Sequence, residues 1–238
     1  MRYEGQPQPF NLSKRPQERW VGFLPLYHCY GQLYTILMAT KLLVPIYVMK
    51  QFVYNDFLQA VQDFKITNLQ VVPPILVMMS KRPETGNYDL SSVKDIFCGA
   101  APLSKDLQND ISARFKCPIY QVWGMTEVTC CAIQMTRGGD DTGSVGMLYP
   151  NCECKLLDED GKEVNVGQPG EIHIRGPNIC LGYWKNNDAT KDSISSDKWL
   201  KSGDVAVCDG KGYFWIIDRK KVRLQPLSLS CNSSNAYK

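Results

Sequence analysis

The first half of this 238-residue chain alternates short apolar runs with helical patterns, and this alternation most constrains its fold. The segments TNLQVVPP, VKDIFCGA and PIYQVW have the length and apolar character of strands. Between the last two, Leu107, Ile111 and Phe115 recur at every fourth position, which predicts an amphipathic helix, and residues 57–64 predict another. Strands alternating with helices favour an α/β fold with a mostly parallel sheet over residues 20–137.

The second half has a different pattern, with short strands and tight turns over residues 138–218. GEIHIRG alternates apolar and polar positions, which is typical of a half-buried strand. Asp160-Gly161 and Asp209-Gly210 each lie between strand-like runs, and the second pair predicts a hairpin. We expect a β-rich subdomain here, a small distorted barrel or a meander. Residues 1–19 are expected to be a polar segment and residues 219–238 to end in a loose tail.

Charge and hydropathy exclude several classes of protein. The net charge is only +3 and the basic residues are dispersed, so neither a nucleic-acid partner nor a basic membrane-binding helix is expected. The N-terminal residues do not resemble a signal peptide, and no apolar run is long enough to span a bilayer. The chain ends in NAYK rather than a peroxisomal tripeptide. We therefore expect a cytoplasmic protein.

The ten cysteines do not have the spacing of a metal site or a disulfide framework. Cys130 and Cys131 are adjacent, Cys152 and Cys154 are one residue apart, and there is no Cys-x-x-Cys pair. The chain has only two histidines. We expect free, mostly buried thiols.

Two loops of the first half carry residue types suited to a nucleotide. They follow successive predicted strands, so both should emerge at the carboxyl edge of a parallel sheet, where ligands bind. Gly99, Ala100 and Ala101 leave room for a flat ring, and Trp123 offers an aromatic face. In the same loop, Thr126 offers a hydroxyl to a phosphate, and Glu127 offers a carboxylate that Mg²⁺ accepts. Alone, each loop is better explained as a packed turn.

Three residues elsewhere could join such a site. Asp204 follows Gly203 in WLKSGDVAV, at what we expect to be the start of a strand, where a carboxylate at a tight turn can accept both ribose hydroxyls. Arg219 ends the run IIDR and could add a ribose or phosphate contact. His28 follows an apolar run. The alternatives are surface ion pairs for the first two and a structural role for the histidine.

Six segments together resemble the adenylate-forming superfamily, most closely 4-coumarate–CoA ligase and related acyl-CoA synthetases. The segments occur in the order of that family, from about Trp20 to Lys221: LPLYHCYG, CGAAPL, WGMTE, GEIHIRGPNICLGY, WLKSGD and DRKK. One such motif would be weak, whereas six in order are specific. The resemblance implies part of the large domain of an acid–CoA ligase. Such an enzyme activates a carboxylic acid with Mg·ATP, releases pyrophosphate, and then transfers the acyl group from AMP to coenzyme A.

The resemblance also implies roles for individual residues. The nucleotide-binding residues would be Gly99, Ala100, Ala101, Gln121, Trp123, Gly124, Thr126, Asp204 and Arg219. The acid would lie against His28, Tyr30, Gly99 and Ala100. His28, Thr126 and Glu127 would be catalytic, with Glu127 as the magnesium ligand, and Lys221 would be the hinge. Gly176, Gly182 and Tyr183 would shape the β-rich subdomain. An aryl acid of the phenylpropanoid type is favoured, then a medium-chain fatty acid. The resemblance leaves a peroxisomal location open for a full-length relative.

The sequence departs from the family pattern in three places. The family has a glycine-rich loop ending in Pro-Lys-Gly ahead of LPLYH, and residues 1–19 contain only Gly5. Beyond Lys221 the chain does not match the domain that carries the family's catalytic lysine. Val122 stands where the family usually has glycine, which would crowd the adenine pocket. We therefore expect a fragment that is inactive alone. The alternatives are a non-catalytic AMP or acyl-adenylate binding module and a non-functional truncated product.

Overall fold

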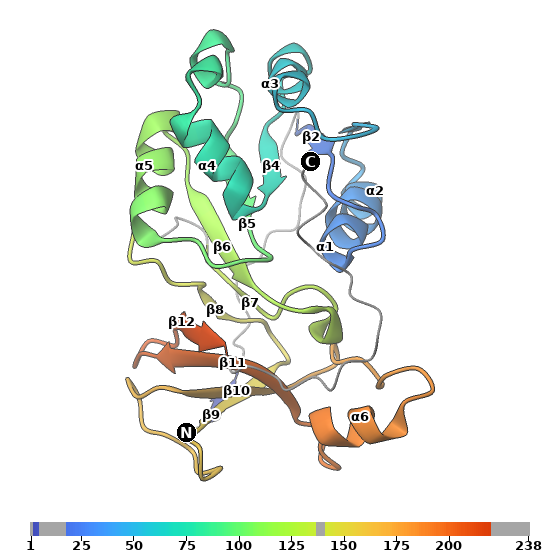
Figure 1. Ribbon diagram of the computed structural model, residues 1–238, viewed down its shortest axis with the longest axis vertical. Coiled ribbons are helices and arrows are strands. Elements are labelled where there is room, and N and C mark those ends of the chain that lie inside the picture. Colours follow the sequence, from blue (N-terminus) through green and yellow to red (C-terminus); the bar gives the residue numbers. More distant parts are fainter. Residues whose placement is uncertain (1, 5–17, 137–140, 220–238) are drawn as a thin grey trace.

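The computed structural model describes residues 2–4, 18–136 and 141–219, which form two sheets, one above the other (Figure 1). Most of the predicted N-terminal segment and the hinge residue Lys221 therefore lie outside the described residues. The larger sheet has seven strands, in the spatial order β3 (Ile46–Val48), β2 (Trp20–Gly22), β4 (Asn68–Val71), β5 (Asp95–Cys98), β6 (Ile119–Trp123), β7 (Ile133–Gln134) and β8 (Met147–Leu148).

The strands β3, β2, β4, β5 and β6 are parallel, and β7 and β8 continue the sheet antiparallel. All four residues of β4 are buried, as expected for a strand covered on both faces. The prediction of a mostly parallel sheet with covering helices is confirmed. β8 follows the predicted junction at residue 138 yet pairs with β7, and that domain boundary stays a prediction.

The helices occur in the connections between strands. α4 begins at Pro73, directly after β4, because proline suits the first turn of a helix. The Ser104 hydroxyl caps α5 by accepting from the backbone N–H of Leu107 (3.3 Å), and Ile111 is fully buried on the sheet. The helical segments are α1 (Cys29–Gly31), η1 (Gln32–Met38), α2 (Ala39–Leu42), α3 (Tyr54–Asp63), α4 (Pro73–Lys81), η2 (Pro83–Asn87), α5 (Lys105–Phe115), η3 (Thr126–Val128) and α6 (Asn187–Ser193).

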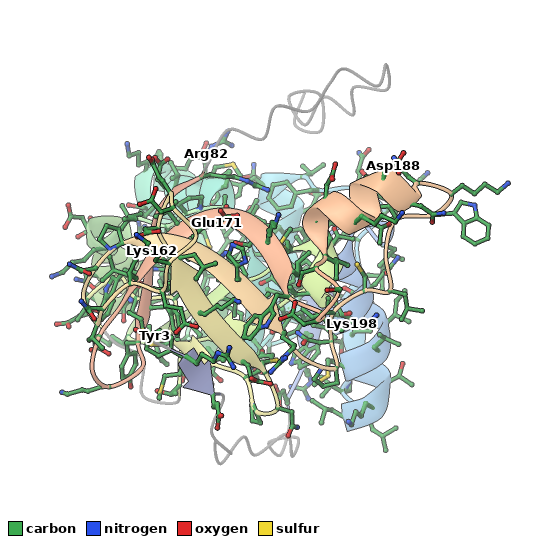
Figure 2. The ribbon with its side chains drawn as sticks, turned by 90° about the horizontal axis from the view of Figure 1, so that it is seen from below. Tyr3, Arg82, Lys162, Glu171, Asp188 and Lys198 are labelled. Atoms are coloured by element: carbon green, nitrogen blue, oxygen red, sulfur yellow. The ribbon has the colours of Figure 1, made fainter. Side chains whose placement is uncertain are left out.

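The smaller sheet is antiparallel, and the successive strands β9 to β12 form a meander. In Figure 2, seen from below, it lies nearest the viewer, with Tyr3 at one edge and Asp188 of α6 to one side. Its edge strands β1 and β12 do not pair with each other, so the barrel alternative is wrong for the described residues. Its strands, in spatial order, are β1 (Arg2–Glu4), β9 (Glu153–Leu157), β10 (Gly170–Arg175), β11 (Leu200–Cys208) and β12 (Phe214–Arg219).

The predicted hairpin between β11 and β12 is confirmed. The Asp209 carboxylate accepts from the backbone N–H groups of Lys211 and Tyr213, both at 2.9 Å, which closes the loop. Gly212 takes the left-handed conformation with φ +88. Two backbone hydrogen bonds join the two sheets. The N–H of Val145 donates to the carbonyl of Phe214 at 2.8 Å, and the N–H of Phe214 donates to the carbonyl of Gly146 at 2.9 Å.

Every cysteine of the described residues is free, and most are buried, as predicted. Burial in the apolar core raises the pKa of Cys98 to about 12, so this thiol stays protonated. Within the described ranges there is no group of three or more His, Cys, Asp or Glu side chains that could hold a metal ion. None of the described helices has the length and apolar character needed to cross a bilayer.

Candidate functional site

The loops after β5 and β6 meet at one edge of the larger sheet, as the parallel register of the two strands requires. Cys98 on β5 pairs with Gln121 on β6, so Gly99 and Val122 follow side by side. A Cβ added to Gly99 would lie 2.5 Å from Cγ2 of Val122 and 3.9 Å from Cε1 of Tyr30. The absence of a side chain at Gly99 therefore accommodates Val122. Val122, which we expected to crowd the adenine pocket, occupies the space where Gly99 has no side chain.

Ala100 is the residue of this loop with an unusual backbone. Its φ is +69, in the left-handed region that non-glycine residues rarely adopt. A residue held there costs about 1–3 kcal/mol and is typical of functional loops. Ala100 and Ala101 are exposed, so both methyl groups are accessible from solvent at the sheet edge.

Trp123 connects the two sheets. It ends β6, and its indole N–H donates to Oδ2 of Asp204 on β11 at 2.9 Å. Oδ1 of the same carboxylate lies 3.4 Å from Nε of Arg219, the last residue of β12. Trp123 is only 6% exposed, so its ring packs mainly inside the protein. The structure thus brings together three predicted nucleotide residues that are far apart in sequence.

Asp204 lies at a β-bulge, and the prediction that it begins a strand at a tight turn is wrong. The strand β11 starts four residues earlier, at Leu200. Its register with β10 shifts between Glu171 and His173, and Gly203 has φ +75. The backbone N–H of Gly203 donates to Glu171 at 3.2 Å, and that of Asp204 to the Ser202 hydroxyl at 3.1 Å. The bulge changes the direction of the Asp204 side chain from the one it would have in a regular strand.

The turn after Trp123 folds tightly on itself. A Cβ added to Gly124 would lie 1.8 Å from the carbonyl oxygen of Cys130, so only glycine allows this approach. The turn places Thr126 at the first position of η3, exposed, with its hydroxyl 4.0 Å from Sγ of Cys29. Thr126 thus lies against the segment that carries His28.

Glu127 forms a hydrogen bond with Tyr183, a residue that we expected only to shape the β-rich subdomain. The hydroxyl of Tyr183 donates to Oε1 of Glu127 at 2.7 Å. Burial, and then the Glu127 carboxylate, raise the pKa of Tyr183 to about 12, so this hydroxyl stays a donor. In the sequence, Tyr183 follows a glycine in CLGYW, and this pattern alone does not predict the contact with Glu127.

His28 and Tyr30 have local partners. The Nδ1 atom of His28 accepts from the backbone N–H of Tyr30 at 3.1 Å and so caps α1. The Tyr30 hydroxyl donates to the Phe97 carbonyl on β5 at 3.0 Å. Burial raises the pKa of Tyr30 well above its usual value. His28 is exposed and forms no hydrogen bond to Thr126 or Glu127, so the structure does not join the three predicted catalytic side chains directly.

The side chain of Gln121, another predicted nucleotide residue, lies inside the protein, and its nucleotide role stays a prediction. Its amide nitrogen donates to Oε1 of Gln108 at 2.6 Å, and the side chain is only 4% exposed. It therefore links β6 to α5 inside the protein.

The assembled residues match the needs of a magnesium nucleotide. Both oxygens of Asp204 have an N–H partner, and a carboxylate has about four lone-pair sites, so each oxygen can still accept a ribose hydroxyl. Glu127 offers one carboxylate, the kind of oxygen donor that Mg²⁺ accepts. Mg²⁺ is commonly held by one or two carboxylates together with phosphates and water, so a cluster of three protein ligands is not required.

Comparison with known proteins agrees with the sequence resemblance. Residues 3–184 match the model of the family described as AMP-binding enzyme. The probable 4-coumarate–CoA ligase 3 of Dictyostelium discoideum is 39% identical over 204 residues, covering 84% of this chain and 37% of that protein. Luciferin 4-monooxygenase of Photinus pyralis is 36% identical over 208 residues, covering 87% of this chain and 38% of that protein. The chain thus spans under two fifths of the length of these relatives.

Solved structures give the same result for the fold. O-succinylbenzoate coenzyme A synthetase of Bacillus subtilis, determined with ATP and magnesium, superimposes with a TM-score of 0.76 at 26% identity. The match covers 88% of this chain and 43% of that one. The predicted resemblance and the predicted partial large domain are confirmed. Because the family model matches more than half of its residues, this chain belongs to the family of AMP-binding enzymes.

Proposed function

We propose that this chain supplies the adenylate-forming site of an ATP-dependent acid–CoA ligase. The contact that carries the proposal is the link from Trp123 through Asp204 to Arg219, which joins the ends of β6 and β12 to the bulge of β11. A carboxylate beside an arginine suits the two hydroxyls and the phosphate of a nucleotide. Relatives named 4-coumarate–CoA ligase and phenylacetyl-CoA ligase favour an aryl acid as substrate, with medium-chain fatty acids next.

The proposed reaction has two steps. The acid's carboxylate attacks the α-phosphate of ATP and releases pyrophosphate; the thiol of coenzyme A then attacks the acyl carbon and releases AMP. Such chemistry depends on positioning and charge stabilisation more than on covalent help from the protein. Asp204 and Arg219 hold the ribose, and Thr126 donates to the α-phosphate.

Other residues complete the proposed site. Glu127 holds magnesium, which would neutralise phosphate charge when bound. Gly99, Ala100, Ala101 and Gly124 shape the space beside the nucleotide. His28 and Tyr30 border the acid, and Lys221 is the proposed hinge. The predicted cytoplasmic location stays a prediction.

Calorimetric titration with AMP and with Mg·ATP tests the nucleotide site. We expect both to bind to the 238-residue chain and to bind much more weakly to Asp204→Ala. Failure of AMP to bind the folded protein would contradict the proposal.

Exchange of labelled pyrophosphate into ATP, with a panel of aryl and fatty acids, tests the chemistry. The resemblance leads us to expect two further elements, a glycine-rich Pro-Lys-Gly loop and a lysine-bearing domain, and these 238 residues span under two fifths of the length of the relatives. If each contributes about 3 kcal/mol to the transition state, exchange should be roughly four orders of magnitude slower than in a full-length relative. Robust exchange by the chain alone would contradict this expectation.

A further inference from the structure

The connection between β10 and α6 crosses the turn that carries Glu127. We call residues 178–183 the strap, which leaves the smaller sheet beside α6 (Figure 1). The Thr129 hydroxyl donates to the Asn178 carbonyl at 2.7 Å, and the Asn178 amide donates to the carbonyl of Val128 at 3.1 Å. The Cys180 N–H donates to the Glu127 carbonyl at 2.8 Å. The strap therefore contacts three successive residues of the turn.

Each end of the strap is itself anchored. At its start, the thiol of Cys152 donates to Oδ1 of Asn178 at 3.2 Å. At its end, the backbone N–H of Tyr183 donates to the hydroxyl of Thr190 in α6 at 2.8 Å. Gly182, with φ +144, lets the chain pass against this threonine, because an added Cβ would lie 2.5 Å from its methyl group. The position of Tyr183 is thus set by the smaller sheet and α6.

Within the strap, Tyr183 forms the hydrogen bond to the Glu127 side chain. The Tyr183 hydroxyl donates to Oε1 of Glu127. Among the described residues, nothing donates a hydrogen bond to the other oxygen, Oε2. A carboxylate with one oxygen fixed by a donor presents the other in a defined direction. Hydrogen bonds of this kind orient metal ligands, and their loss typically reduces metal affinity about 10- to 100-fold.

We propose that Tyr183 is a positioning residue that aims the Glu127 carboxylate at the magnesium of the bound nucleotide. The inference rests on the proposed function, because it takes Glu127 as the magnesium ligand. In this proposal, the strap also couples the smaller sheet to the part of the site that would bind magnesium.

Tyr183→Phe removes only the hydroxyl and keeps the ring. We expect the magnesium concentration that half-maximally enhances ATP affinity to rise about tenfold, with affinity for AMP in the absence of magnesium changed less than about twofold. Calorimetric titrations over a magnesium series measure both. Tyr88→Phe, which lies against the core of the larger sheet, is the matched control and should leave both values unchanged.

A double-mutant comparison separates positioning from a general structural effect. Glu127→Gln should weaken the magnesium dependence by itself, and adding Tyr183→Phe should then change it no further. Additive effects of the two changes, or an unchanged magnesium dependence in Tyr183→Phe while the wild type binds Mg·ATP, would overturn the inference alone. A wild-type chain whose nucleotide binding does not respond to magnesium would overturn both the proposed magnesium role of Glu127 and this inference.

Discussion

The two sheets contribute to the candidate site in different ways. The larger sheet supplies loops at the carboxyl ends of adjacent parallel strands, so Gly99 and Val122 are neighbours because their strands are. The smaller sheet supplies single side chains from irregular places: Asp204 at a bulge, Arg219 at a strand end and Tyr183 on a long connection. The first contribution follows from topology, whereas the second depends on local departures from regular structure.

This difference predicts which substitutions should disturb each part of the site. The larger sheet's loops follow directly after the mostly buried strands β5 and β6, so their arrangement should tolerate surface changes. The smaller sheet reaches the site through a few polar contacts, of which the indole–carboxylate hydrogen bond is the most buried. Changes at those contacts should disturb the site before they unfold either sheet.

Truncation of a core phenylalanine in each sheet gives the largest expected effect. Phe57 belongs to the core of the larger sheet, and Phe214 belongs to a second core that packs β9 to β12 against β6, β7 and β8; both are fully buried. Phe57→Ala and Phe214→Ala should each cost about 3–5 kcal/mol of unfolding free energy. Urea denaturation followed by tryptophan fluorescence and by circular dichroism measures this. Because Phe214 also bonds to residues 145 and 146, we expect one transition for both variants; two separated transitions would show that the sheets unfold independently.

The turn after β6 is tested by Gly124→Ala. The new methyl group would meet backbone atoms, Cys130 oxygen at 1.8 Å and Cys131 Cα at 2.5 Å, which cannot move aside as a flexible side chain can. We expect a loss of about 3 kcal/mol and of nucleotide binding, measured by thermal denaturation and calorimetry. Gly86→Ala is the control, since no atom lies within 4 Å of its Cβ position. Similar behaviour of the two variants would contradict the tight turn.

The link between the sheets is tested by replacing Asp204. Asp204→Ala leaves the buried indole N–H of Trp123 without its acceptor, which should cost about 1–3 kcal/mol. Asp204→Asn can still accept from the indole, so it should recover much of this stability while nucleotide affinity stays reduced. Asp160→Asn, on an exposed turn, should change neither quantity. If the asparagine variant were as unstable as the alanine variant, charge rather than the hydrogen bond would maintain the link.

Arg219 should give the smallest change in stability. Its side chain is 71% exposed, and an exposed ion pair contributes little, so Arg219→Ala should alter the unfolding free energy by less than about 0.5 kcal/mol. AMP affinity should nevertheless fall about tenfold, because a charged hydrogen bond to the nucleotide contributes about 1.5 kcal/mol. Lys211→Ala in the nearby hairpin is the control. Unchanged AMP affinity in Arg219→Ala would remove this residue from the site.

Much of the fold was predictable from local patterns. Strands β4, β5 and β6, helices α3 and α5, and the β11–β12 hairpin all have clear apolar periodicity or turn residues. The open edges of the smaller sheet were not predictable, because strand length and alternation are the same in a meander and in a barrel. The bulge at Asp204 was missed for a related reason: Gly203 is compatible with a turn or a bulge, and only pairing with β10 decides between them.

The sequence by itself determined the order of motifs, the residue types that can meet a magnesium nucleotide, and membership of a family with six ordered signatures. These are properties of neighbouring residues and of strand order. The tertiary structure decided which residues meet: it joined Trp123 to Asp204, gave Glu127 a partner in Tyr183, and turned Gln121 inward to Gln108. The physical reason is that hydrogen bonds between distant segments depend on strand register, bulges and side-chain direction, none of which is encoded in local periodicity.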